Sequence, residues 1–235
     1  PRPYWMFRLR KAYDRWWTRR FLAPHFDALG DFARIENPWR VEVTGRNIRA
    51  GRALHVLADR AAPVRLTTWP APDSEAAITL GDAVLLIAGT RLMAAERITI
   101  GAGVMLAANT TITDSDWHGL YDRVGPPSAA PVAIGDNVWI GDGAFVGKGV
   151  TIGENAVIGA RAVVVNDIPE GAVAVGNPAR VVKTLDPDAP RRTRVDLLAD
   201  PLALDRYFTS LQKDRLSGNT LLSWLRVRLA PNQND

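Results

Sequence analysis

The chain contains three histidines, and one of them lies in a short polar cluster that could support acid–base chemistry. His118 closes the run Asp114-Ser115-Asp116-Trp117-His118. A neutral imidazole is suited to remove the proton of a hydroxyl group, because its pKa lies close to working pH. His25 lies in a segment that we expect to be helical, and His55 lies in a degenerate repeat. The sequence therefore predicts His118 as a general base.

Two aspartates of the same cluster are candidates to orient this base. A histidine base is generally held by a carboxylate or carbonyl oxygen on its second nitrogen. In an extended segment Asp114, Asp116 and His118 would share one face. Either carboxylate could instead hold the hydroxyl groups of an acceptor, or cap the turn. We therefore predict Asp116 and Asp114 as catalytic partners, and Asp114 also as an acceptor ligand.

The element that must position this cluster is a six-residue repeat that restarts just after it. An aliphatic residue recurs at every sixth position, at Ile134, Ile140, Val146, Ile152, Ile158 and Val164. Glycine follows each of the first five. A period of six fits neither a helix nor an isolated strand pair, and it predicts a parallel β-helix with three hexads in each coil. Parallel crossovers are normally right-handed, so the period alone does not give a left-handed coil.

Weaker repeats extend this pattern upstream of the polar cluster. A degenerate first coil is predicted over residues 41–57, and the period returns at Leu80. It slips by two residues between Ala94 and Ile98. After the polar cluster the chain leaves the coil in a loop over residues 120–130. A polar loop ejected from a regular solenoid usually lies on the functional face.

We predict a mainly β protein with three parts. Residues 1–40 form an N-terminal amphipathic helix and connector, and residues 41–184 form the β-helix. Residues 185–235 form a helical extension, with helices over 195–211 and 221–229 that cap the open end of the β-helix.

The N-terminal segment concentrates the positive charge of the chain. Residues 1–20 carry a net charge of +6, whereas the whole chain carries +4, so the remainder is slightly acidic. Residues 3–29 are predicted to form a helix with an aromatic and a basic face. Two interpretations stay open: packing against the β-helix or a neighbouring subunit, or peripheral contact with an anionic membrane surface. The basic run has no nucleic-acid-binding motif, and no nucleic-acid partner is predicted.

Composition limits the remaining choices. The chain has no cysteine, so we expect neither disulfides nor a thiolate metal site. It has no apolar run of eighteen residues and no apparent secretory signal, so we expect a cytoplasmic protein, with the inner membrane face as the alternative location. A zinc site of the β-helical carbonic anhydrases needs three histidines on adjacent coils, and no metal is predicted.

Residues 131–183 resemble the hexapeptide-repeat O-acetyltransferases, and among these the maltose, galactoside and nodulation-factor sugar acetyltransferases. The resemblance implies a left-handed parallel β-helix, a homotrimer, and transfer of acetyl from acetyl-CoA to a hydroxyl of a saccharide or glycoconjugate. It also implies that His118 is the catalytic histidine. N-acetylation of an amino-sugar or antibiotic is an alternative, and so is a β-helix scaffold without catalysis.

The expected acetyl-CoA site combines shape with this resemblance. A thin pantetheine arm suits a groove of exposed backbone, and Gly141, Gly159 and Ala160 would allow that approach. An amide near Gly141 could hold the thioester oxyanion. The resemblance implies three further residues of the acetyl-CoA site, which are Trp139, Arg180 and Lys183.

Two departures from the resemblance concern the substrates. Asn166 stands where several relatives have a lysine, which puts one coenzyme contact in doubt. On the acceptor side, the Asn and Asp of the relatives have their nearest counterparts at Ile87 and Ala95, so Glu96 is the acceptor-binding candidate. We therefore expect an acceptor other than the simple sugars of those relatives.

Overall fold

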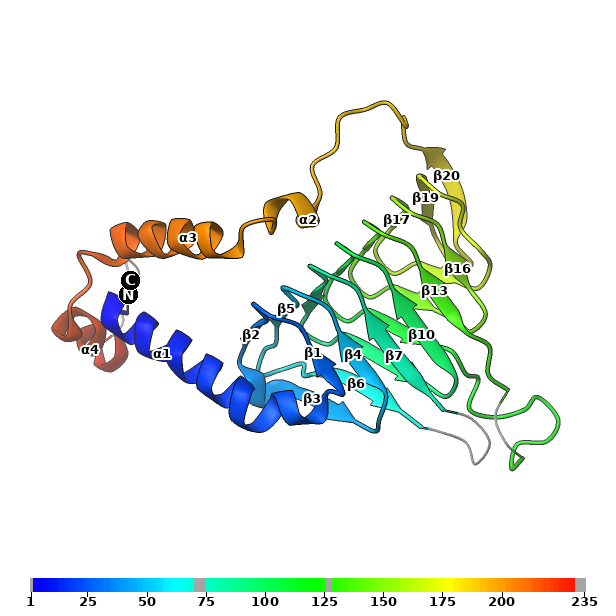
Figure 1. Cartoon of the computed structure of the whole chain (residues 1–235), viewed down its shortest axis with the longest axis horizontal. Helices are drawn as coiled ribbons and strands as arrows, with labels where there is room; N and C mark the ends of the chain where they lie inside the picture. Colours follow the sequence, from blue (N-terminus) through cyan, green and yellow to red (C-terminus); the bar gives the residue numbers. More distant parts are fainter. Residues whose placement is uncertain (1, 70–74, 126–127, 231–235) are drawn as a thin grey trace.

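A computed structural model describes residues 2–69, 75–125 and 128–230 of the chain. Most of these residues wind through three sheets in turn, and the strands of successive turns pair in parallel (Figure 1). The prolines at 70, 72, 126 and 127, which the sequence places in loops, lie outside the described residues. The prediction of a mainly β fold built from parallel sheets is confirmed.

Three sheets form the walls of this coil. Sheet A consists of β1 (Ala28–Leu29), β4 (Ile48–Ala50), β7 (Ala77–Leu80), β10 (Arg97–Ile100), β13 (Val132–Ile134) and β16 (Thr151–Ile152). Sheet B consists of β2 (Arg34–Glu36), β5 (His55–Leu57), β8 (Leu85–Ile87), β11 (Met105–Leu106), β14 (Trp139–Ile140), β17 (Val157–Ile158), β19 (Ala172–Val175) and β20 (Arg180–Thr184). Sheet C consists of β3 (Val41–Thr44), β6 (Val64–Thr68), β9 (Arg91–Ala94), β12 (Thr111–Thr113), β15 (Phe145–Val146) and β18 (Val163–Val164).

The hexad aliphatics fill the interior between the three sheets. The six that define the repeat are all buried, with at most 3% of their surface exposed, and the residues four positions after each are buried with at most 4% exposed. Stacking pairs them between coils, for example Ile140 of β14 opposite Ile158 of β17. Each fully buried Ile, Leu or Val stabilises the fold by about 1.5–3 kcal/mol. The repeat is therefore the core of the protein.

The glycines of the repeat have a structural reason that differs from the expected one. A Cβ atom on Gly141 would lie 2.6 Å from the backbone nitrogen of Ala160 in the next coil. A Cβ atom on Gly159 would lie 2.6 Å from Cγ1 of Val175. Both positions are glycine because adjacent coils stack closely there.

The coil begins earlier than predicted. Strands β1 and β2 already pair with β4 and β5, although the sequence assigned these residues to a helix and a connector. Leu29, Ile35 and Val41 keep the six-residue spacing, and Gly30 follows the first of them, so the sequence does contain a signal for these strands that the prediction missed. The predicted helix over residues 3–29 is shorter: α1 (Tyr4–Trp17) continues through the irregular turns η1 (Thr18–Leu22) and η2 (Ala23–His25).

The C-terminal extension runs back along the coil and does not cap its end (Figure 1). The last strand of sheet B is β20, antiparallel to β19. Beyond it come α2 (Arg194–Leu197), α3 (Pro201–Leu216) and α4 (Leu221–Leu229). Arg194 Nε donates to the carbonyl of Ala83 at 3.0 Å, and Lys11 Nζ of α1 pairs with Asp205 of α3 at 2.6 Å. The extension therefore meets the start of the chain.

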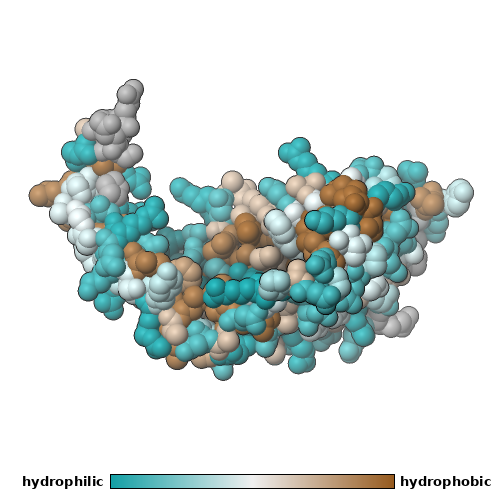
Figure 2. Space-filling view, turned by 90° about the horizontal axis from the view of Figure 1, so that it is seen from above, coloured by the Kyte–Doolittle hydropathy of each residue, from teal (hydrophilic) through white to brown (hydrophobic). Residues whose placement is uncertain are grey.

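Hydrophobic residues also reach the surface of the protein. Figure 2 shows them in separate patches, divided by hydrophilic residues, on the coil and on the helical appendage. Among the described residues, no helix combines the length and the apolar composition needed to cross a bilayer.

His55 fastens the extension to the coil in its neutral form. Arg194 lies 3.5 Å from its Nδ1, and its Nε2 is buried without a hydrogen-bond partner. Burial lowers the pKa of His55 to about 4, and the charges of Arg34 and Arg194 act in the same direction. An unfolded histidine takes up its proton near pH 6.5, whereas the folded one resists until about pH 4.

We therefore expect the protein to lose stability as the pH falls from 7 to 5. The unfolded state binds more protons over this range, and the loss attributable to His55 reaches about 2 kcal/mol. Thermal unfolding followed by circular dichroism at both pH values measures it. His55→Gln should flatten this dependence, whereas His25→Gln, at an exposed position, should leave it unchanged. Equal pH dependence in both variants would contradict the assignment.

Candidate active site

The loop that carries His118 is rooted in the coil by Asp114. The Asp114 side chain is completely buried. Its carboxylate accepts backbone hydrogen bonds from Ala95 at 2.7 Å, Glu96 at 2.8 Å and Arg97 at 2.6 Å. These amides form the turn between β9 and β10, where the six-residue period slips by two. Asp114 lies at the start of the loop in one coil, and its carboxylate binds the irregular turn of the preceding coil.

This arrangement corrects the predictions for Asp114. A carboxylate that is fully buried and bound to three amides is available neither to orient His118 nor to hold an acceptor. Glu96 is half-buried, and its side chain makes no hydrogen bond or ion pair within the described residues. Of the two acceptor-binding candidates, only Glu96 keeps a carboxylate that can meet a ligand.

The two limbs of the loop are joined at its base. Ser115 and Ala129 form an antiparallel bridge, and the amide of Ala130 donates to the carbonyl of Asp114 at 2.8 Å. Lys148 of the next coil fixes both limbs from outside. Its Nζ lies 2.5 Å from the Asp116 carboxylate and 2.8 Å from the hydroxyl of Ser128. Asp116 is thus paired with a lysine, and its predicted contact with His118 is absent from the described structure.

A backbone carbonyl orients His118 in place of an aspartate. Its Nδ1 lies 3.0 Å from the carbonyl oxygen of Arg123 in the same loop. Because a carbonyl oxygen only accepts, Nδ1 must carry the hydrogen, and the unprotonated nitrogen of the neutral ring is Nε2. The imidazole is exposed. It can therefore accept a proton at Nε2.

The residue before His118 holds an unusual backbone conformation. Trp117 has φ of 64°, in the left-handed region that bulky residues avoid. Such a conformation costs about 1–3 kcal/mol and persists only where its surroundings enforce it. The hydroxyl of Ser115 accepts from the Trp117 amide at 3.1 Å, and the indole packs edge-on against Trp69 at 4.7 Å between ring centroids. This turn fixes the direction in which His118 leaves the coil.

The predicted site residues fall on two corners of the coil. The corner between sheets C and A holds Glu96, Asp114, Asp116, His118 and Asn166, together with Lys148. Sheet B and its corner with sheet C hold Trp139, Gly141, Gly159, Ala160, Arg180 and Lys183. Within one chain the structure therefore separates the candidate base from most of the expected coenzyme residues, and it places Asn166 on the side of the base.

Two of the expected coenzyme residues share one row on the outer face of sheet B. Trp139 pairs with Val157, Val157 with Val173, and Val173 with Lys183. Trp139 is half-exposed, and Lys183 is exposed. Three strand spacings separate them, about 14 Å. Such a row suits an extended ligand with an anionic end at Lys183.

The amide of Gly141 is already used in the coil. It donates to the carbonyl of Ile158 at 2.8 Å. The expected role of this amide as an oxyanion donor is therefore not supported, because the ladder between coils occupies its hydrogen. Asn166 and Ala160 are exposed, and Arg180 donates to the carbonyl of Ala179 at 2.9 Å.

A shallow groove lies on the outer face of sheet A, next to the root of the loop. Its volume is about 340 Å³, and its lining includes Arg49, Thr79, Arg97 and Thr99. The backbone amide of Arg97 is one of those that Asp114 binds. The groove and the His118 loop are therefore joined at one corner of the coil.

Two contributors to this site escaped the sequence analysis. Lys148 stands at a turn of the strict repeat, where its only signal is a charged residue between Gly147 and Gly149. Trp69 directly follows β6, in a segment of the sequence without a six-residue period. The described residues contain no group of three or more His, Cys, Asp or Glu side chains placed to hold a metal ion.

Residues 131–166 match the family described as bacterial transferase hexapeptide (six repeats). These residues therefore carry the hexapeptide repeat of that family. Galactoside O-acetyltransferase of Escherichia coli is 42% identical over 91 residues, which cover 38% of this chain and 45% of that enzyme. The 2,3,4,5-tetrahydropyridine-2,6-dicarboxylate N-acetyltransferase of Clostridium botulinum is 49% identical over 70 residues, 30% of each chain. The chain thus spans less than half the length of these relatives.

A solved structure shares the fold of this chain. A hexapeptide-repeat acetyltransferase of Vibrio cholerae, determined with acetyl coenzyme A, has a TM-score of 0.54 and 23% identity. The similarity covers 77% of this chain and 82% of the Vibrio protein. At this identity it concerns the fold.

We expect Asp114→Asn to destabilise the protein by about 2–3 kcal/mol. An asparagine of the same shape has one acceptor oxygen, and its amide group would face a backbone N–H. Urea unfolding measures the change. Asp116→Asn is the matched control, because it breaks only a surface ion pair and should cost under about 1 kcal/mol. Equal effects of the two substitutions would refute the role of Asp114 as the anchor.

Proposed function

We propose that this protein is an acetyl-CoA-dependent O-acetyltransferase that acts on a hydroxyl of a saccharide or glycoconjugate. The observation that carries the proposal is the geometry of His118: the Arg123 carbonyl occupies Nδ1 and leaves Nε2 as the proton acceptor. The named O- and N-acetyltransferases that share the repeat support the reaction class.

The proposed reaction needs one proton transfer and one displacement. Nε2 of His118 removes the hydroxyl proton while the acceptor oxygen bonds to the thioester carbonyl carbon. The carbon–sulfur bond then breaks, and the coenzyme A thiolate leaves with the proton from the imidazolium. His118 returns to its neutral form. No covalent acetyl-enzyme is required.

We further propose that the coil is left-handed and that the active protein is a homotrimer. The separation of the predicted residues on two corners supports the homotrimer, and the match of residues 131–166 to the hexapeptide family supports the left-handed coil. His118 leaves the corner between sheets C and A, whereas Trp139 and Lys183 line sheet B. Packing of one copy's His118 corner beside another copy's sheet B would bring base and thioester together.

On the acetyl-CoA side, the proposal assigns the row on sheet B. The half-exposed Trp139 would contact the pantetheine arm, while Lys183 and Arg180 would meet the phosphate groups. Gly159 and Ala160 lie at the adjoining corner. Asn166 would reach the coenzyme from the corner that carries His118.

On the acceptor side, the groove beside the loop is the proposed saccharide site. Its arginines and threonines supply donors for hydroxyl or carboxylate oxygens, and Glu96 stands next to Arg97 at the same turn. We propose that the reaction takes place in the cytoplasm, with residues 3–29 as the segment that would meet the inner membrane face.

His118→Ala should lower kcat by about 10²–10⁴-fold, because it removes the general base. Acetyl-CoA should still bind, as measured by isothermal titration calorimetry. A thiol-release assay with sugars, amino-sugars and glycolipid fragments gives the turnover. His25→Ala serves as the control and should keep full activity. Full turnover by His118→Ala would exclude the proposed mechanism, and turnover of amino-sugars alone would favour N-acetylation.

Arg97→Gln should raise the KM for the acceptor about tenfold, because a charged hydrogen-bond donor of the groove is lost. The kcat and the KM for acetyl-CoA should stay within about twofold. Steady-state kinetics with both substrates varied separates these constants. Arg52→Gln removes the same charge from an exposed turn elsewhere and should change neither. An unchanged acceptor KM in Arg97→Gln would place the acceptor outside the groove.

A further inference from the structure

Helix α1 meets the coil with a narrow and partly polar side. Asp14 and Thr18 are its buried residues, and Arg10 pairs with Asp14 at 3.0 Å. Tyr13 and Trp17 pack against Trp39 in the turn η3 (Pro38–Arg40), with ring centroids 5.6 and 5.8 Å apart. These contacts account for the side of the helix that faces the protein.

The opposite side of α1 leaves large apolar side chains exposed. Trp5 is 50% exposed, Leu9 61% and Trp16 53%. At 100° per residue the three fall within an arc of about 40°, so they form one stripe along the helix. The packing of α1 on the coil therefore covers Trp17 but leaves the stripe of Trp5, Leu9 and Trp16 exposed to solvent.

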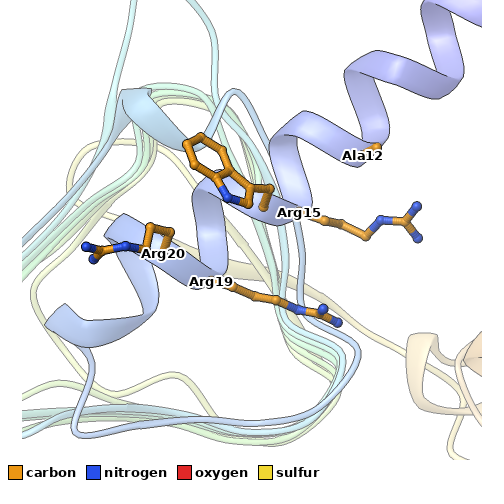
Figure 3. A pocket seen from close by; sticks show the side chains of 5 residues that line it. Ala12, Arg15, Arg19 and Arg20 are labelled. Carbon is orange, nitrogen blue, oxygen red and sulfur yellow. The ribbon is translucent and has the colours of Figure 1, made fainter.

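Arginines flank the same stripe, and the charge of Arg15 acts on Asp205 of α3 without forming an ion pair with it. Arg15, Trp16, Arg19 and Arg20 line a shallow pocket of about 600 Å³ with Ala12. Figure 3 shows Arg15 and Arg19 extending to one side of the helix and Arg20 to the other. Within the described residues neither Arg15 nor Arg19 makes a hydrogen bond or an ion pair. The only acid of residues 1–20, Asp14, is buried on the far side.

We propose that this face of α1 binds an anionic phospholipid surface, with the helix axis in the plane of the bilayer. Tryptophan and leucine side chains enter the boundary between headgroups and acyl chains, and the flanking arginines bind lipid phosphates. The argument is charge complementarity: a stripe of apolar side chains flanked by unpaired cations matches an anionic interface.

A second helix of similar composition lies beside the start of α1. Helix α4 has Trp224, Arg226 and Arg228 and no acidic residue. The preceding turn is tied to the N-terminus, because Asn219 Nδ2 donates to the carbonyl of Arg2 at 3.2 Å. The C-terminal extension, through α4, thus adds further basic and aromatic groups at the same end of the protein (Figure 1).

Vesicle flotation of the full chain tests the charge requirement. We expect binding to vesicles that contain phosphatidylglycerol, none to phosphatidylcholine alone, and weaker binding at high salt. Arg15→Gln combined with Arg19→Gln should lower the partition coefficient about 20–30-fold. Arg191→Gln combined with Arg192→Gln removes the same charge from the exposed linker and should change it less than twofold.

The apolar requirement is tested by a separate pair of variants. Trp16→Ser should weaken vesicle binding about tenfold, because its indole no longer enters the interface. Phe32→Ser changes an aromatic residue of similar exposure in the coil and should leave binding unchanged. Flotation does not require turnover, so its result is separate from that of the acetyl-transfer assays.

Three outcomes would overturn the proposal. The first is equal flotation of the Arg15/Arg19 double variant and its linker control, and the second is equal binding to both vesicle types. The third is no vesicle binding by the wild type, in which case the assembly mass of Trp16→Ser is compared with that of the wild type by analytical ultracentrifugation. A change of mass would then assign the stripe to a contact between copies of the chain.

Discussion

The rest of the structure depends on the stacking of one coil directly on the next. Each strand finds its hydrogen-bond partners one turn along the chain, so the backbone must pass neighbouring coils at the distance of a sheet. This constraint determines which residue types occupy each position of the six-residue repeat. An aliphatic side chain fills the interior, and glycine follows it where a Cβ atom would strike the next coil. The positions of all exposed groups are consequences of this stacking.

Regular stacking also explains why the buried carboxylate of Asp114 is needed where the repeat is irregular. A solenoid has no spare donors in its ladders, and an irregular turn leaves amides without partners. The turn at Ala95, Glu96 and Arg97 is such a place, and the Asp114 carboxylate satisfies all three amides. Because Asp114 also begins the inserted loop, the irregularity and the insertion support each other. The orientation of the loop that carries His118 therefore depends on the irregular turn to which Asp114 binds.

The sequence predicted the parts of the molecule that carry a period. The core positions from Ile134 to Val164 follow from spacing alone, and so does the loop that leaves the coil. Strands β1 and β2 were missed although Leu29, Ile35 and Val41 keep the six-residue spacing, because strands of two or three residues beside an aromatic helix resemble a connector. Side-chain partners were also beyond reach. The spacing of Asp114, Asp116 and His118 is compatible with one shared face. In the structure, however, Asp114 is buried in the coil and Asp116 forms an ion pair with Lys148.

The division of the predicted residues between two corners bears on how such a repeat can become an enzyme. A straight coil offers flat walls and shallow corners, and the grooves found on this chain are open ones. Exposed groups such as His118 and Trp139 gain a low-dielectric surrounding only when a second surface covers them, and electrostatic interactions strengthen there. A corner that projects a rigid loop and a wall that presents a row of side chains are complementary shapes. In the proposed enzyme, assembly would enclose the reaction between a corner and a wall, and the anchored loop would supply the rigidity that such an enclosure requires.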